Sequence, residues 1–130
     1  MESRRECMTI DTNIIIAYLT GDEEIVNTLS DWKRAGVPLF LSSVVEAEIL
    51  SFSEWTSEER RNAESFLEEH FVSIPFDRTL ARLAASLRRT TRIKLPDAAI
   101  AATALYTGSP LVTRNIRDFR KVDGLTIIDL

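Results

Sequence analysis

The fold is decided by a short strand joined to a helix, Cys7-Met8-Thr9-Ile10-Asp11-Thr12-Asn13-Ile14-Ile15. Cys7–Ile10 is short, mostly apolar and followed at once by polar residues, which is typical of a buried strand. Asp11 and Asn13 are residue types that cap helix N-termini, and the apolar residues after them continue as a helix that ends near Gly21. This stretch therefore predicts the strand-to-helix unit from which parallel α/β sheets are built.

The same alternation continues to the end of the chain. Further strands are predicted at Leu39–Leu41, Phe71–Ile74, Pro110–Val112 and Thr126–Ile128. Helices are predicted between them, at residues 22–35, from Ser42 or Ser43 to about Phe52, from Thr56 to about His70, across Leu80–Leu87, and at Asp97–Tyr106. Neither a repeat nor a linker rich in Pro or Ser interrupts this order. We therefore expect one α/β domain over residues 1–130, with a mainly parallel central sheet and helices on both faces.

The composition agrees with a single compact domain, because 45% of the 130 residues are hydrophobic and 28% are charged. Cys7 is the one cysteine, so it has no disulfide partner within the chain and is expected to be a buried thiol. No apolar run approaches the roughly 18 residues of a membrane span. The charged N-terminus is not followed by the apolar stretch of a secretory signal, so a cytoplasmic protein is expected.

Charge is distributed unevenly along the chain, whose formal net charge is −4. Eight of the sixteen Lys and Arg residues lie in two short stretches, which are Arg88, Arg89, Arg92 and Lys94, then Arg114, Arg117, Arg120 and Lys121. Six glutamates lie in residues 54–69 instead. A locally basic surface on an acidic protein still attracts polyanions, because such fields act over about 10 Å.

Four carboxylates are assigned by this plan to the same edge of the sheet. Asp11 directly follows the first strand, and Glu48 lies within two turns of the start of the helix after the second strand. Asp97 falls in the first turn of its helix, and Asp118 follows the fourth strand after a short loop, Thr113–Arg117. Because ligand sites in such sheets lie beyond the carboxyl ends of the strands, we expect the four acids to gather there.

Each acid alone has a simpler explanation. An aspartate at a helix N-terminus, as at Asp11 and Asp97, is stabilised there by the helix dipole. Glu48 stands on a partly apolar helix face, where an acid without a cationic partner is costly. Glu46 competes with Glu48, but residues two apart on a helix point in different directions, so only one of the two belongs to a site. The shared position of the four acids, rather than any one of them, predicts a functional site.

The chemistry of this residue set points to a divalent metal ion. Carboxylates gathered in one place repel one another unless a cation neutralises them. His70 is the only histidine and stands at the expected end of a helix, in a surface or capping position, so it supplies neither a zinc site nor a base for a serine or cysteine nucleophile. The expected cation is therefore Mg²⁺ or Mn²⁺, which prefer oxygen ligands, and such sites are typical of phosphoryl transfer.

Four blocks of the sequence contain the candidate acids. They are Ile10-Asp11-Thr12-Asn13, Ser42-Ser43-Val44-Val45-Glu46-Ala47-Glu48-Ile49-Leu50, Leu95-Pro96-Asp97-Ala98-Ala99-Ile100-Ala101-Ala102 and Leu111-Val112-Thr113-Arg114-Asn115-Ile116-Arg117-Asp118-Phe119. Together these blocks resemble the motifs of VapC-type toxins of the PIN-domain family. The blocks occur in the family's order and spacing and span almost the whole chain. In the second block the family's acid precedes two large apolar residues, which by resemblance makes it Glu48.

The resemblance implies a three-layer α/β/α sandwich around a five-stranded sheet, and an endoribonuclease that hydrolyses phosphodiester bonds with a metal-activated water. The implied ligands of Mg²⁺ or Mn²⁺, direct or through water, are Asp11, Glu48, Asp97 and Asp118, of which Asp118 matches the acid that varies most within the family. The implied supporting residues are Thr12, Asn13, Thr113 and Asn115. Met1–Cys7 is expected to be an N-terminal extension, because the family commonly starts a few residues before its first aspartate.

The resemblance also implies partners. The substrate would be RNA, and the chain would form a homodimer and act as the toxin of a type II toxin–antitoxin pair, with an antitoxin protein whose tail blocks the site. The sequence itself adds Phe52, Trp55 and Phe66 on adjoining helices, which form either an exposed apolar patch or part of the core.

The two basic stretches are expected to border the acidic site, because they precede Asp97 and surround Asp118. Their candidate RNA-binding residues are Arg89, Arg92, Lys94, Arg114 and Arg117. A helix end and a loop carry such charges without any ligand, as a solvated surface. Our hypothesis is that they form a track for the RNA backbone, whose approach to the acids they would ease.

Other classes of protein fit the residues less well. A phosphoacceptor receiver domain needs two adjacent acids after its first strand and a lysine after its last, whereas this chain has Asp11 alone and no lysine beyond Lys121. A phosphatase with an aspartyl nucleophile needs Asp-x-Asp where this chain has Asp11-Thr12-Asn13. The alternative that remains is a catalytically inactive PIN-like module that binds RNA or protein. A binding module has no need to hold four mutually repelling acids.

Overall fold

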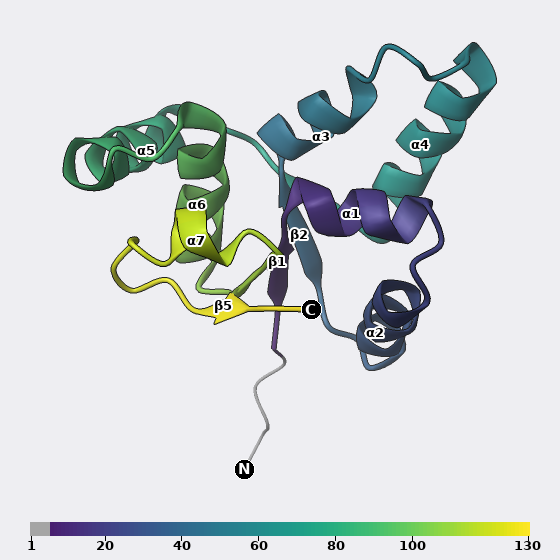
Figure 1. The fold of residues 1–130 in the computed structure, drawn as a ribbon, viewed down its shortest axis with the longest axis horizontal. Helices are drawn as coiled ribbons and strands as arrows, with labels where there is room; N and C mark the ends of the chain where they lie inside the picture. Colours follow the sequence, from purple (N-terminus) through teal and green to yellow (C-terminus); the bar gives the residue numbers. More distant parts are fainter. Residues whose placement is uncertain (1–5) are drawn as a thin grey trace.

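The computed structural model describes residues 6–130 and contains a five-stranded sheet in which every pair of neighbouring strands is parallel (Figure 1). The strands are β1 (Met8–Ile10), β2 (Leu39–Ser42), β3 (Val72–Ile74), β4 (Leu111–Val112) and β5 (Ile127–Ile128). Their order across the sheet is β3-β2-β1-β4-β5. β1 is the central strand, and the chain continues to β2 and β3 on one side of it and to β4 and β5 on the other. The carboxyl end of β1 is therefore the point where a parallel sheet offers a crevice for ligands.

Helices cover the sheet on both sides. They are α1 (Thr12–Leu19), α2 (Glu23–Arg34), α3 (Ser43–Leu50), α4 (Ser57–His70), α5 (Arg78–Thr91), α6 (Leu95–Thr107) and α7 (Ile116–Phe119). In Figure 1, α5 and α6 lie on one side of the central strands, and α1, α2 and α4 lie on the other. The predicted three-layer α/β/α sandwich is confirmed, and its sheet is parallel throughout.

Helix α6 is the most deeply buried helix of the described chain. Its residues from Ala98 to Ala104 are all buried, and five of these seven are alanines. Small side chains let a helix approach its neighbours closely, which is why a helix of such composition fits between α5 and the sheet. Pro96 lies in the first turn, where its missing N–H costs nothing, so the helix starts just before Asp97.

Two local predictions were wrong. The loop predicted at Thr113–Arg117 gives way at Ile116 to the short helix α7, which holds Phe119 fully buried. Four residues are too few to show helical periodicity in a sequence. Cys7 precedes β1 and is only half-buried, rather than a buried strand residue. Residues 1–5 of the expected N-terminal extension lie outside the described part of the chain.

None of the helices in residues 6–130 combines the length and the apolar character that crossing a bilayer requires.

Candidate functional site

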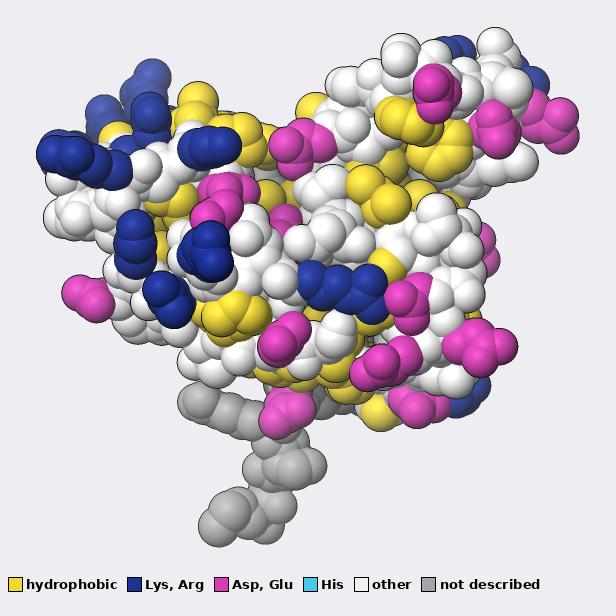
Figure 2. All heavy atoms as spheres, in the orientation of Figure 1, with side chains coloured by type: hydrophobic (Ala, Val, Ile, Leu, Met, Phe, Trp, Pro, Cys, Tyr) yellow, Lys and Arg dark blue, Asp and Glu magenta, His cyan; other side chains and the backbone are white. Residues whose placement is uncertain are grey.

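The four predicted acids lie along the carboxyl edge of the sheet. Asp11 caps α1 directly after β1, Glu48 lies in α3, Asp97 lies in the first turn of α6, and Asp118 lies in α7. Asp11, Asp118 and Glu48 are all close enough to Asp97 for their negative charges to raise its pKa. Figure 2 shows acidic side chains on both sides of the hollow between the α3–α4 side and the α5–α7 side.

Asp11 is the most enclosed of the four, with 5% of its surface exposed. Its backbone N–H donates to Val112 O at 3.0 Å, which extends the pairing of β1 with β4 and brings Thr113 beside it. Oδ1 accepts from the Thr12 N–H and Oδ2 from the Thr113 hydroxyl, both at 2.7 Å. Burial raises the pKa of Asp11, these hydrogen bonds oppose the rise, and the charge of Glu48 adds to it.

Asp97 has the most strongly displaced pKa at the site. Burial, followed by the negative charges of its three acidic neighbours, raises this pKa from 3.8 to about 6, while Lys94 acts in the opposite direction. A carboxyl whose ionised form is this unfavourable is suited to a bound cation, which would return the pKa to lower values.

Glu48 is exposed, so the cost expected for an acid on this partly apolar helix face does not arise. Its carboxylate is instead oriented by a hydrogen bond, because the Thr12 hydroxyl donates to Oε1 at 2.8 Å. Ser42 caps the N-terminus of α3 by accepting from the Val44 N–H at 3.1 Å. Of the two glutamates in α3, Glu48 is the one whose charge acts on both Asp11 and Asp97.

Asp118 is exposed and is joined to Asp11 by a chain of hydrogen bonds. The Asn115 side-chain amide donates to Asp118 Oδ2 at 2.8 Å, and the Asn115 N–H donates to the Thr113 hydroxyl at 2.9 Å. That hydroxyl in turn donates to Asp11. Asn13 holds the start of the same loop, because its Oδ1 accepts from the Arg114 N–H at 3.4 Å. The four predicted supporting residues therefore all lie at this edge.

Cations line the site on its α5–α7 side. A hollow of about 180 Å³ is bounded by Asp97 and Asp118 together with Thr91, Arg92, Ile93, Lys94 and Lys121. Lys121 stood in a predicted basic stretch but was not among the candidate RNA-binding residues. No local sequence pattern indicates which residues after Asp118 turn back toward the acids.

The other predicted cations are placed differently. Arg89 lines an adjoining hollow, to which Arg92 also contributes, and Arg117 is exposed on α7. The Arg114 guanidinium donates to Asp22 Oδ2 at 2.8 Å and to Leu130 O at 3.0 Å. The hydrogen bond from Arg114 lowers the pKa of Asp22. Arg114 thus has a structural role in tying the end of the chain to the cap of α2, whereas an RNA contact by Arg114 or Arg117 stays a prediction.

The four carboxylates are the right kind of ligand for a hard cation, but in this structure they stand too far apart to hold one ion together. All four acids offer carboxylate oxygens, the ligands that Mg²⁺ and Mn²⁺ prefer. Within residues 6–130, however, no three acidic, His or Cys side chains stand close enough together to hold one ion. Three of the carboxylates bind donors of the protein instead, since Asp11, Glu48 and Asp118 accept from Thr113, Thr12 and Asn115.

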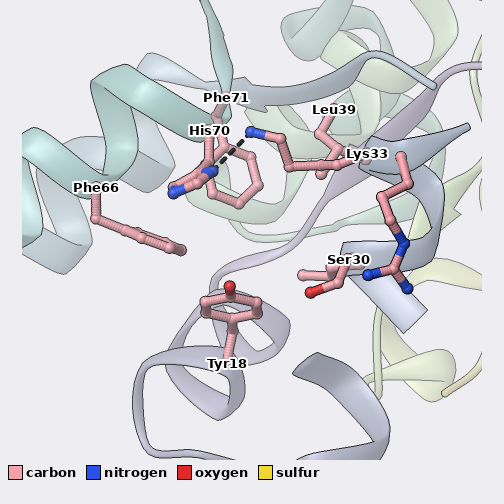
Figure 3. Close-up of a pocket in the computed structure, with 9 residues that line it drawn as sticks. Tyr18, Ser30, Lys33, Leu39, Phe66, His70 and Phe71 are labelled. Atoms are coloured by element: carbon pink, nitrogen blue, oxygen red, sulfur yellow. Dashed lines mark hydrogen bonds between the residues drawn. The ribbon is translucent and has the colours of Figure 1, made fainter. Parts of the chain in front are cut away.

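A separate hollow, of about 160 Å³, lies between α1, α2 and α4 and is mainly apolar (Figure 3). Tyr18, Phe66 and His70 face one another across it, with ring centroids 4.9 Å apart for Tyr18 and Phe66 and 4.8 Å apart for Phe66 and His70. Lys33 Nζ donates to His70 Nδ1 at 2.6 Å. His70 is therefore half-buried in a wall of this hollow rather than a surface or capping residue.

The predicted aromatic patch is divided between two environments. Phe52 is 55% exposed, whereas Trp55 and Phe66 are half-buried and line a further hollow along α1 and α4. The Trp55 indole N–H donates to Ile49 O at 2.8 Å, so this ring is tied to the end of α3.

These features define the class of protein. It is a parallel α/β/α sandwich with four carboxylates at the carboxyl edge of its sheet and cations on one side of them. Comparison with known proteins makes the class specific. The PIN-domain model matches residues 8–125, and the chain therefore belongs to the PIN-domain family.

The relatives of this chain include VapC proteins. It is 30% identical over 131 residues to Ribonuclease VapC1 of Rickettsia felis, with 93% of this chain and 94% of the relative covered. It is also similar in structure to VapBC2 of Rickettsia felis, which was solved bound to a DNA fragment from its promoter. The TM-score is 0.82 at 22% identity, and the match covers 95% of this chain and 98% of the other. A toxin–antitoxin complex from Klebsiella pneumoniae gives a TM-score of 0.76 at 29% identity, and the match covers 93% of this chain and 95% of the other.

Proposed function

We propose that this protein is an Mg²⁺- or Mn²⁺-dependent endoribonuclease and the toxin of a type II toxin–antitoxin pair. The observation that carries the proposal is that four carboxylates from distant parts of the sequence lie at one edge of the sheet. Burial, and then the charges of the other three acids, raise the pKa of Asp97 to about 6. Placing mutually repelling acids near one another costs free energy, and a cation bound for the reaction would offset this cost. The name of the relative Ribonuclease VapC1 supports RNA as the substrate.

The proposed metal ligands, direct or through water, are Asp11, Glu48, Asp97 and Asp118. When bound, such a cation supplies a water of lowered pKa and stabilises negative charge on the phosphate group. The protein's own contribution is orientation. Thr113 and the Thr12 N–H fix the Asp11 carboxylate, the Thr12 hydroxyl fixes Glu48, and Asn115 fixes Asp118. Fixed carboxylates need little rearrangement when the charge of the reaction develops.

The substrate backbone would approach from the α5–α7 side. Arg92, Lys94 and Lys121 stand in the same hollow as Asp97 and Asp118, so their charges offset the repulsion between the acids and a phosphate. Lys94 already acts on Asp97 by lowering its pKa.

An antitoxin protein is the proposed macromolecular partner. Support comes from the similarity to a toxin–antitoxin complex from Klebsiella pneumoniae at 29% identity. The hollow between α1, α2 and α4, lined by Tyr18, Phe66 and Phe71, offers such a partner an apolar surface. Homodimerisation and a cytoplasmic location complete the proposal, by analogy with the family.

The reaction is tested by incubating the purified chain with single-stranded RNA and Mg²⁺ or Mn²⁺. We expect cleavage that EDTA stops, with products that carry a 5′-phosphate and a 3′-hydroxyl, because water is the proposed nucleophile. Products ending in a 2′,3′-cyclic phosphate would mean that the 2′-hydroxyl of the RNA attacks, and would contradict this mechanism. Tight RNA binding without cleavage under any metal condition would favour the inactive binding module instead.

A further inference from the structure

A hollow lined by arginines adjoins the acidic site. It lies on the last turns of α5 and is bounded by Ala85, Arg88, Arg89 and Arg92. All the charged side chains that line it in the described chain are therefore cationic. The Arg88 Nε donates to Ile93 O at 3.1 Å, which holds this guanidinium in place. Arg89 and Arg92 form no ion pair with the acids of residues 6–130, so their charges are available to a ligand.

The backbone of Arg92 is the unusual feature of this hollow. Arg92 ends α5 with φ 57° and ψ 22°, in the left-handed region, and it is the one residue other than glycine in residues 6–130 with a positive φ. Glycine is favoured at such helix ends because any Cβ costs free energy there. Arginines near a helix C-terminus are stabilised by the helix dipole, which accounts for Arg88 and Arg89. The helix dipole does not account for Arg92, which stands in the left-handed position that favours glycine.

The position of Arg92 offers a reason for this cost. Arg92 lines both hollows, the one with the three arginines and the one with Asp97 and Asp118. The two hollows therefore border each other at this side chain. Figure 2 shows Lys and Arg side chains gathered over the α5–α7 side, so an anionic chain that leaves the acids is attracted in this direction.

We propose that Arg88, Arg89 and Arg92 form a subsite for a backbone phosphate of the substrate that is separate from the phosphate cleaved at the acids. This inference rests on the proposed function. The guanidinium groups supply the forked donors that suit phosphate oxygens, and Arg92 links the subsite to the reacting centre. The three arginines are positioning residues, which hold the strand in register rather than take part in the reaction.

The variant Arg92→Gly gives a sharp test, because it removes the side chain and relieves the left-handed backbone at once. We expect its thermal midpoint to equal or exceed that of the parent, so a loss of binding is not a loss of fold. Affinities are measured in an Asp97→Asn background, which prevents cleavage, for oligouridylates of increasing length at fixed Mg²⁺. Arg61→Ala, which removes an exposed arginine of α4, is the charge-matched control.

In the Asp97→Asn background, affinity should rise by about tenfold at the one length that reaches the subsite, as expected for a charge-assisted contact. Arg92→Gly should abolish this step and reduce the slope of log K against log salt by about 0.7, the value of one phosphate contact in a single strand. Arg61→Ala should keep both. Arg92→Lys, which retains the charge, should recover part of the step.

A smooth increase of affinity with length, or a step that survives in Arg92→Gly, would overturn the subsite while leaving the ribonuclease proposal intact. Failure of the wild-type chain either to cleave RNA or to bind any oligouridylate would instead overturn the proposed function, and the subsite with it.

Discussion

The hydroxyl of Thr113 donates a 2.7 Å hydrogen bond to Oδ2 of Asp11, although 102 positions separate the two residues in the sequence. The pairing of β1 with β4 makes this contact, because each residue directly follows one of two adjacent parallel strands. Thr113 also accepts from the Asn115 N–H, so one buried hydroxyl connects the first and last acids of the site.

Replacement of Thr113 by Val should destabilise the metal-free protein at pH 7. The nearly isosteric change removes the donor from a buried carboxylate, which costs about 1–3 kcal/mol. It should also raise the pKa of Asp11 further, because this hydrogen bond now opposes the effect of burial. Urea denaturation measures the first effect and carboxyl NMR titration the second. Thr113→Ser, which keeps the hydroxyl, is the control, and equal stability of the two variants would contradict the role given to this bond.

Metal binding should depend on Glu48 and not on Glu46. Mn²⁺ is expected to raise the thermal midpoint of the wild-type chain, because a ligand that binds only the folded state stabilises it, by about 2.7 kcal/mol at 100 times its Kd. Glu48→Gln should lose most of this rise, whereas Glu46→Gln, with the same change two residues away in α3, should retain it. Thermal melts with and without Mn²⁺ provide the measurement. Equal responses in the two variants would argue against a site at Glu48.

Without metal, stability should fall as the pH rises from about 4 to about 6. The folded state holds the Asp97 proton more tightly than the unfolded chain, since the pKa is about 6 rather than 3.8, so deprotonation in this window favours unfolding. The full shift corresponds to roughly 3 kcal/mol, and screening at this partly exposed carboxyl lowers the expected effect to about 1–2 kcal/mol.

Asp97→Asn should remove that part of the pH dependence and make the metal-free protein more stable than wild type at pH 7. Urea denaturation in EDTA across pH 4–7 checks this, with Asp123→Asn as the control, because Asp123 is an exposed acid between α7 and β5. A wild-type chain whose stability rises through this window relative to Asp97→Asn would show that the pKa of Asp97 is lowered instead.

Enlarging a side chain inside α6 should damage the fold. Ala101 is fully buried in this alanine-rich helix, and Ala101→Leu adds carbon atoms where neighbours are closely packed, at a cost of about 1–3 kcal/mol. Ala81→Leu on the exposed face of α5 should have little effect. Urea midpoints at unchanged m-value measure both changes. Equal midpoints would mean that α6 has room beside it.

The sequence by itself determined the order of the elements and the edge where the acids gather. Strands and helices at these positions follow from local signals, such as the cap at Asp11, the Thr56–Glu59 capping box and Pro96 before Asp97. The carboxyl ends of parallel strands share one edge of a sheet, so residues at those ends were predictable neighbours without any coordinates.

The tertiary structure alone decided how individual side chains are used. Arg114 and Asp22 pair across 92 positions, and the same contact gives a predicted RNA-binding arginine a structural partner. The left-handed backbone of Arg92, the return of Lys121 to the acids and the enclosure of His70 by Phe66 are likewise set by packing between distant segments. Local sequence patterns carry the backbone preferences of neighbouring residues, whereas these partners are fixed only when the whole chain has folded around the sheet.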